Sequence, residues 1–388
     1  MFPFTKKRVY LDWASGAPVS KAAQSALNGA LKVYGNPSSP HEEGVRAKQL
    51  LEEARTTIAR LAEVKPSGVV FTSGATEANN LALLGVVMKA KESEQRPHVL
   101  YLPSAHASVI ESLHALGRWE VEVEPLRITD GRIDLVHLKT QIRPETRLVT
   151  VDAVCSETGT RWDTRGVKNA LMKEKSRAFL HVDASQAPPT MPFSLTRLSA
   201  DLLTLDAQKV GGVRGIGALC MRSRVKLTPI LHGGGQEGGM RPGTEAVPLI
   251  RAFAKALQES EGTRDAFRRD AERMRTSLIN TLSQALPDLL INQGKEGVPH
   301  ILNLSFPGRD TDYAVMLLDK EGFAVATKSA CETDSEHGSR AVLALTNDIS
   351  RASSTLRVSW GPKTSVKDLK SFASALIRVI RFLDASSV

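Results

Sequence analysis

The sequence predicts an α/β protein with a largely parallel sheet, followed by a smaller α+β unit at the C-terminal end. Over the first two thirds of the chain, short apolar runs alternate with helical patterns, as in repeated strand–helix–strand units. In the last third, one long amphipathic segment precedes further strand patterns. These two observations together favour two domains built on different sheets.

The strands predicted for the first region cover residues 68–72, 98–102, 147–153, 178–183 and 201–205. The first of them leads through the turn SGATE into a helical pattern that continues to residue 91. Helical stretches also precede the third and the fourth strand. This order is typical of a sheet whose parallel strands are joined by helices.

The last third begins with a predicted helix over residues 264–286, whose apolar side chains recur on one face until Pro287 ends the pattern. Strand patterns at 301–306, 323–327 and 355–359 and a helical pattern at 365–382 follow. We place a domain boundary between residues 255 and 265, where Gly262 lies.

The composition is typical of a globular protein outside the membrane. Of 388 residues, 41% are hydrophobic and 24% are charged, and no apolar run reaches the roughly 18 residues that a membrane helix needs. The first residues lack the pattern of a secretory signal. We therefore expect a cytoplasmic protein with no membrane association. The net charge of +9 is spread along the chain without a nucleic-acid motif, so no direct nucleic-acid binding is expected.

The three cysteines, Cys155, Cys220 and Cys331, lie far apart and match no metal or redox spacing, so no metal site is expected. An odd number also argues against a disulfide framework. An isolated cysteine is most often a small buried hydrophobe. Cys331 differs because its segment, SACETDSEHGSR, is polar enough to expose a reactive thiol. Lys328 and His337 would favour its thiolate, while the acidic neighbours would oppose it.

The turn SGATE is a candidate anion site. Gly74 and Ala75 would expose backbone N–H groups at the start of a helix, and Thr76 would add a hydroxyl donor. An ordinary joint between a strand and a helix also needs small residues, so both interpretations stay open. A second candidate is the glycine-rich segment LHGGGQEGGMRPGT, where Arg241 and Thr244 could donate to an anion, unless the segment is only a flexible loop.

Three polar residues follow predicted strands and could carry chemistry. Lys209 stands between an apolar run and glycines, where loss of water would lower the pKa of its amine and favour a Schiff base. Asp183 closes a strand and could face a pyridinium nitrogen. His106 could stack on a flat cofactor or move protons. A surface lysine, a helix-capping aspartate and a capping histidine are the alternatives.

Taken in order, these segments resemble the cysteine desulfurase family of class V, fold-type I PLP enzymes, in its long-loop subgroup. The matching segments are YLDWASGAPV, YGNPSSPH, FTSGATEANNLAL, HVDASQ, the lysine at 209, RGIGAL, HGGGQEGGMRPGT, SAC and LRVSWG. The resemblance implies a fold-type I PLP-dependent transferase with a mainly parallel seven-stranded sheet. The large domain would cover residues 15–260. The small domain would combine 1–14 with 261–388 and carry the catalytic cysteine loop.

The resemblance implies pyridoxal 5′-phosphate (PLP) as the cofactor and L-cysteine as the substrate. Lys209 would hold PLP and move the Cα proton of the substrate. Asp183 would pair with the ring nitrogen, Gln186 would contact the ring hydroxyl, and His106 would stack on the ring. The full set of cofactor contacts would be Gly74, Ala75, Thr76, His106, Asp183, Gln186, Gln208, Lys209 and, from the second subunit of a homodimer, Thr244.

The same resemblance assigns substrate binding and sulfur transfer. Asn36, Ser156 and Arg357 would bind the substrate, and arginine suits a carboxylate because its guanidinium forms paired hydrogen bonds. Cys331 would take the sulfur as a persulfide and release alanine. A sulfur-acceptor protein, either a scaffold or a carrier, would then receive the sulfur.

The chain departs from the family pattern at three places. Asp206-Ala207-Gln208 replaces the usual Ser-Gly-His before the lysine, and a carboxylate facing a phosphate is repulsive unless it points elsewhere, is protonated or pairs with a cation such as Arg241. Cys155 and Ser156 replace two asparagines, and Lys328 replaces a glycine. Two other functions therefore stay open: another PLP enzyme (a C–S or C–Se lyase or a class V aminotransferase) and a non-catalytic scaffold.

Overall fold

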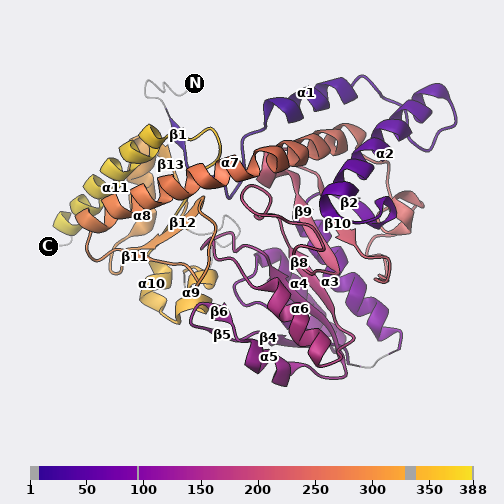
Figure 1. Cartoon of the computed structure of the whole chain (residues 1–388), viewed down its shortest axis with the longest axis horizontal. Helices are drawn as coiled ribbons and strands as arrows, with labels where there is room; N and C mark the ends of the chain where they lie inside the picture. Colours follow the sequence, from indigo (N-terminus) through magenta and orange to yellow (C-terminus); the bar gives the residue numbers. More distant parts are fainter. Residues whose placement is uncertain (1–7, 94–95, 328–337, 387–388) are drawn as a thin grey trace.

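The computed structural model describes residues 8–93, 96–327 and 338–386. Two regions with separate hydrophobic cores are joined by the long helix α7 (Val247–Ala285), which crosses the molecule in Figure 1. The helix predicted over 264–286 therefore begins earlier than expected. Its first half presents Ile250, Phe253 and Leu257 to the larger core, and its second half packs Phe267 into the smaller one. Because burial of these side chains stabilises the helix, Gly262 lies inside it and does not end it. The domain boundary itself stays a prediction.

The larger region is built on a seven-stranded sheet with the order β2-β10-β9-β8-β7-β3-β4. Only β10 runs antiparallel to its neighbours, so the predicted fold, α/β with a mainly parallel seven-stranded sheet, is confirmed. The strands are β2 (Val69–Thr72), β3 (His98–Tyr101), β4 (Glu122–Pro125), β7 (Thr146–Asp152), β8 (Phe179–Asp183), β9 (Leu202–Asp206) and β10 (Gly217–Met221).

Helices α1 (Lys21–Ala30), α2 (Glu42–Ala62), α3 (Ala75–Lys91), α4 (Ala107–Leu116), α5 (Leu135–Gln141) and α6 (Thr164–Lys173) accompany this sheet. A small hairpin, β5 (Ile128–Thr129) and β6 (Arg132–Ile133), lies at its edge in Figure 1. Single helical turns occur at η1 (Pro66–Gly68), η2 (Gly117–Trp119), η3 (Ala207–Val210) and η4 (Gln236–Gly239). Strands β2, β7 and β9 are buried along nearly their whole length, which explains their continuous apolar patterns.

The smaller region contains the antiparallel sheet β11-β12-β14 and the parallel pair β1-β13. These strands are β1 (Val9–Tyr10), β11 (Leu290–Ile291), β12 (Ile301–Ser305), β13 (Phe323–Ala324) and β14 (Thr355–Ser359). The helices are α8 (Thr311–Lys320), α9 (Arg340–Thr346), α10 (Ile349–Ser353) and α11 (Val366–Ser386). The pairing of β1 with β13 brings the start of the described chain into this region, so the segment after β1 passes between the two regions.

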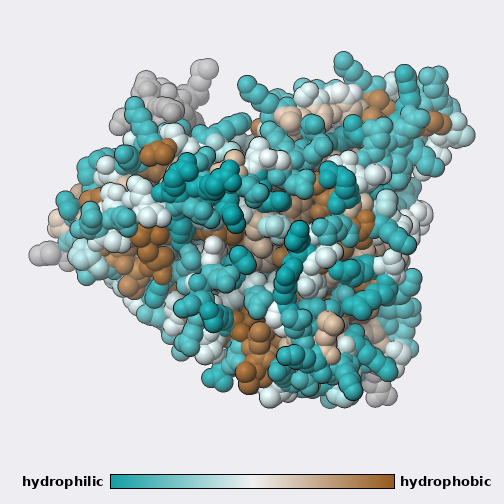
Figure 2. Space-filling model, viewed as in Figure 1, coloured by the Kyte–Doolittle hydropathy of each residue, from teal (hydrophilic) through white to brown (hydrophobic). Residues whose placement is uncertain are grey.

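Three neighbouring parallel strands each end in an aspartate: Asp152 on β7, Asp183 on β8 and Asp206 on β9. The carboxyl ends of parallel strands are the usual place for a ligand in an α/β sheet, so this edge is where a site is expected. Hydrophilic residues dominate the molecular face shown in Figure 2, with smaller hydrophobic areas between them. No helix among the described residues is both long enough and apolar enough to cross a membrane.

Candidate active site

Lys209 lies on the turn η3, directly after β9, and Gly211 ends this turn with a positive φ of 79°. Its Nζ donates hydrogen bonds to the backbone carbonyl oxygens of Ala14, at 2.8 Å, and Ser15, at 2.9 Å. Burial lowers the pKa of Lys209, because the charged form loses water, although nearby carboxylates oppose this shift. An amine with a lowered pKa is more often uncharged and so more nucleophilic.

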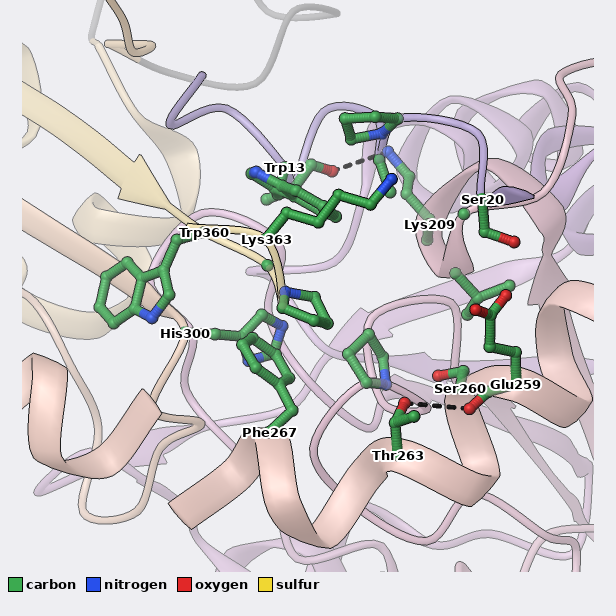
Figure 3. A pocket seen from close by; sticks show the side chains of 18 of the residues that line it. Trp13, Ser20, Lys209, Glu259, Ser260, Thr263, Phe267, His300, Trp360 and Lys363 are labelled. Carbon is green, nitrogen blue, oxygen red and sulfur yellow. Dashed lines mark hydrogen bonds between the residues drawn. The ribbon is translucent and has the colours of Figure 1, made fainter. Parts of the chain in front are cut away.

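A cavity of about 140 Å³ borders the lysine. Figure 3 shows Lys209 on the opposite side of this cavity from His300 and Phe267. Gln186 also lines it, but Asp183 and His106 do not. The cavity therefore touches the lysine from the side of helix α7 and does not enclose all the residues predicted to bind a ring.

A continuous set of hydrogen bonds connects Asp183 to His106. The carboxylate of Asp183 accepts a hydrogen bond of 2.9 Å from Asn79 on α3 and another of 2.9 Å from the backbone N–H of Ser185. The Asn79 amide also donates to the hydroxyl of Ser108, which lies 2.9 Å from Nδ1 of His106. His106 caps α4 through the same nitrogen. The capping role and a role at a ring are thus compatible, because one face of the imidazole remains separate from its ring-plane hydrogen bonds.

Asp152 is a residue that the sequence analysis missed. It lies opposite Asp183 in the register of β7 and β8, and it is only 7% exposed. One of its carboxylate oxygens has no hydrogen-bond partner among the described residues. Burial, followed by the charges of Asp183 and Glu157, raises the pKa of Asp152 to about 8. The sequence pattern could have indicated Asp152, because it closes an apolar strand, and an acid at such a position is costly unless it is paired or protonated.

The turn after β1 connects the lysine to Arg357, which projects from β14 of the smaller region. The Arg357 guanidinium donates to the carboxylate of Asp12 at 2.7 Å, to the hydroxyl of Ser15 at 2.6 Å and to the backbone oxygen of Ser156 at 3.1 Å. Its Nε is buried and has no partner among the described residues. Arg357 and Ser156 therefore lie together, as their predicted roles require. Asp12 and Ser15 were not anticipated, although they belong to the matching segment YLDWASGAPV.

Asp206 places a carboxylate at the N-terminus of α3. One oxygen accepts a hydrogen bond of 3.1 Å from the backbone N–H of Ala75, and the other accepts one of 2.9 Å from that of Gln208. Arg241 does not pair with Asp206, which was one of the possibilities considered above. It binds Glu77 at 3.0 Å instead.

Glu77 in turn accepts a 2.7 Å hydrogen bond from the backbone N–H of Ser73. Burial opposes ionisation of Glu77, but the bonds from Ser73 and Arg241 lower its pKa overall. The preference of Arg241 is therefore explained, since Glu77 is an ionised partner within reach. Gly74 precedes the helix with φ of 154°, a conformation that disfavours residues with a side chain.

The remaining predicted contacts are less closely joined to the lysine. Asn36 lies in an exposed turn and bonds the backbone N–H of Ser38 at 2.9 Å. Thr76 is exposed in the first turn of α3, and Thr244 is exposed in the loop before α7. Gln186 donates to the oxygen of Ala14 at 2.8 Å, the same oxygen that Lys209 binds. Their roles stay predictions.

The two described cysteines are poor nucleophiles. Cys155 and Cys220 are buried, and burial raises the pKa of each to about 12. Cys331 and Lys328 lie outside the described residues. Just beyond that segment, the Ser339 hydroxyl donates to the carboxylate of Glu157 at 2.5 Å, which ties the start of α9 to the strand-end region.

The ring-binding end of this arrangement fits a pyridoxal cofactor. It combines an amine of lowered pKa with a buried carboxylate and an imidazole, and the last two belong to one hydrogen-bond network through Asn79 and Ser108. The phosphate-binding end fits less well, because a carboxylate already bonds one of the helix N–H groups. This fold with this site defines the class of fold-type I PLP enzymes.

Comparisons with known proteins agree with that class. The family model described as Aminotransferase class-V matches residues 9–372. A mitosomal cysteine desulfurase of Encephalitozoon cuniculi is 34% identical over 97% of this chain and 88% of the relative. Cysteine desulfurase IscS 1 of Archaeoglobus fulgidus is 33% identical over 97% of this chain and 98% of the relative. A solved NifS-like protein superposes with a TM-score of 0.90 at 27% identity, covering 97% of this chain and all of that one.

The chain therefore belongs to the class-V aminotransferase family and, within it, to the cysteine desulfurases.

Proposed function

We propose that this chain is a PLP-dependent cysteine desulfurase that converts L-cysteine to L-alanine and transfers the sulfur to Cys331. One observation carries the proposal. A single turn, residues 12–15, contacts both the amine of Lys209, whose pKa is lowered, and the guanidinium of Arg357. An amino-acid substrate of a pyridoxal enzyme needs such a pair, because its amino and carboxylate groups must be recognised side by side.

The cofactor would be held by Lys209, by Asp183 at the ring nitrogen, by Gln186 and by the face of His106. Gly74, Ala75, Thr76 and Gln208, with Thr244 of a second subunit, would surround its phosphate. When bound, PLP supplies an electron sink for the Cα atom of the substrate. The hydrogen bond from Asn79 orients the carboxylate of Asp183 for this contact.

Arg357 would neutralise the charge of the substrate carboxylate, and Lys209 would move the proton of the substrate Cα atom. Arg357 would bind the substrate carboxylate, with its unpartnered Nε as a further donor, while Asp12 keeps the guanidinium in place. Ser156 and Asn36 would complete this subsite. The lowered pKa of Lys209 favours the free amine, which can take the Cα proton and return it to the product.

Sulfur transfer would then use Cys331, which lies outside the described residues. Its thiolate would attack the substrate sulfur, forming a new S–S bond as the C–S bond breaks. The electron pair and a proton remain with the carbon, so the products are alanine and the Cys331 persulfide, and no external oxidant is required. A nucleophile on a loop can approach the substrate and then reach a sulfur-acceptor protein. A homodimer and a cytoplasmic location belong to the same proposal.

The experiment measures alanine and sulfide released from L-cysteine in the presence of a thiol reductant. It compares the wild type with Cys331→Ala and with Cys155→Ala as the matched control, and it records the visible cofactor band of each. We expect Cys331→Ala to keep the band and lose both products, and Cys155→Ala to keep both, because its thiol is buried with a pKa of about 12. Bound cofactor without alanine formation by the wild type would point to another substrate. Absence of cofactor binding would favour a scaffold role.

A further inference from the structure

Asp206 occupies the position at the N-terminus of α3 where an anion would bind. Both of its carboxylate oxygens are used, one by the N–H of Ala75 at 3.1 Å and one by the N–H of Gln208 at 2.9 Å. The side chain is fixed, since Asp206 is only 7% exposed and its backbone pairs with Gly217 of β10.

The backbone that carries Asp206 and the turn before α3 pack closely together. A Cβ atom at Gly217 would stand 2.7 Å from the backbone carbon of Gly74, so β10 and the turn before α3 are packed directly together. A Cβ atom on Gly74 would lie 3.7 Å from the carboxylate of Asp206. The carboxylate therefore borders the turn on one side and the lysine turn on the other, because Gln208 precedes Lys209.

Among the described residues, no Lys, Arg or His side chain forms an ion pair with the carboxylate of Asp206. Both oxygens are bonded to neutral backbone groups, and the guanidinium of Arg241 is bound to Glu77. Among the carboxylates that oppose the lowering of the Lys209 pKa, Asp206 contributes most, so its side chain lies near the amine. A helix N-terminus carries the equivalent of about half a positive charge, and the carboxylate of Asp206 already lies there.

We propose that Asp206 sets the cofactor preference of this site by weakening the binding of the phosphate group, so that unphosphorylated pyridoxal binds nearly as tightly as PLP. The inference rests on the proposed function, because it assumes that Lys209 holds a pyridoxal ring. A phosphate monoester carries about 1.5 to 2 negative charges near neutral pH, so it repels a fixed carboxylate. Pyridoxal has the same ring and aldehyde but lacks this charge.

The test measures dissociation constants of PLP and of pyridoxal for the cofactor-free protein, from the visible band that a lysine-bound aldehyde produces. The wild type is compared with Asp206→Ser and with Asp206→Asn, which keeps the size and removes the charge. Asp163→Ser is the matched control. Asp163 also caps a helix through a 2.8 Å bond from the backbone N–H of Gly166, but that helix is α6 and not α3.

For the wild type we expect the two dissociation constants to agree within about tenfold. Both Asp206 variants should tighten PLP binding by roughly 10- to 100-fold, while the affinity for pyridoxal changes by less than about threefold. The Asp163 variant should change neither. Thermal unfolding of each cofactor-free variant establishes that it is folded.

Two results would overturn the inference and differ from a failure of the proposed function. If both compounds bind and the PLP-to-pyridoxal ratio is the same in the wild type and both Asp206 variants, Asp206 does not set the preference. The same holds if the variants tighten both compounds equally, because the effect would then be structural. If neither compound forms a visible band in any variant, the proposed function fails, and this inference fails with it.

Discussion

Lys209 and Arg357 are two basic side chains, the first half-buried and the second fully buried, that contact the same turn from different regions of the molecule, yet their partners differ. Lys209 is bonded to two backbone carbonyl oxygens, whereas Arg357 is bonded to the carboxylate of Asp12 and to a hydroxyl. Carbonyl oxygens satisfy the hydrogen-bonding capacity of an amine without supplying an opposite charge. Burial therefore lowers the pKa of Lys209, while Arg357 keeps a counter-charge beside it.

Burial without a counter-charge also shifts the pKa of Asp152, but for a carboxyl group the shift is upward. Asp152 is buried beside Asp183, with no cationic contact among the described residues, and its pKa rises to about 8. Among Lys209, Arg357 and Asp152, the charge of the neighbouring group, and not the number of hydrogen bonds, therefore decides which side chain stays ionised. Four predictions test this conclusion, beginning with the largest expected effect.

Replacing Lys209 with alanine tests the reactive member of the pair. We expect loss of the visible cofactor band and a fall in alanine formation on the order of 10³-fold or more, because the amine serves as both nucleophile and base. Lys363→Ala is the control, since this lysine lines the same cavity without bonding the turn. Cofactor absorbance and initial rates are measured for both. If the Lys209 variant keeps a normal cofactor band and a normal rate, Lys209 is not the residue that holds the cofactor.

Arg357→Lys tests the paired member by keeping the charge and removing the forked geometry. The KM for L-cysteine should rise by about 100-fold, because lysine cannot form paired bonds to a carboxylate while also reaching Asp12. Arg351→Lys, on α10 and bonded to the oxygen of Ile291, serves as the control. Steady-state kinetics separate KM from kcat. An unchanged KM would mean that the substrate carboxylate binds elsewhere.

Asp12→Asn removes the counter-charge of Arg357 and tests the comparison most directly. We expect the free energy of unfolding to fall by about 1 to 3 kcal/mol, because a buried guanidinium loses its ionised partner. Asp12 also opposes the lowering of the Lys209 pKa, so that pKa should fall further in the variant. Urea unfolding measures the first effect, and the pH dependence of cofactor binding measures the second. A rise of the Lys209 pKa would contradict the argument.

Asp152→Asn tests whether the raised pKa of Asp152 makes the stability of the protein depend on pH. The pKa of Asp152 is about 8 in the folded protein against 3.8 as its ordinary value, so between these values the folded state binds more protons than the unfolded state. Stability contributed by Asp152 should therefore fall as pH rises from 4 to 8, by up to about 1.4 kcal/mol per pH unit. The Asn variant lacks this loss. Urea unfolding at several pH values gives the difference, and parallel curves for the two proteins would refute the shift.

Local pattern was sufficient for much of the fold. The predicted strands agree with β2, β3, β7, β8 and β9 to within about a residue at each end. Each of them is a short apolar run between more polar segments, and such a run indicates a buried strand. The helix predicted over 264–286 was too short, since its first half reads as weakly amphipathic until the larger core is placed beside it. Asp12 lies in a matching segment and Asp152 closes an apolar strand, but the contacts that make them important come from residues far away in the chain.

The amino-acid sequence was enough to predict the order of strands and helices, the strand that ends in Asp183, the position of Lys209 shortly after a strand, and the family. These properties depend on periodicity and on short motifs, which neighbouring residues define. The folded chain was needed to show that Ala14 accepts a hydrogen bond from Lys209, 195 residues away, and that Asp206 bonds the N–H of Ala75 while Arg241 binds Glu77. The physical reason is that the partner of a buried charge is chosen by packing and distance in space, and local sequence does not encode either.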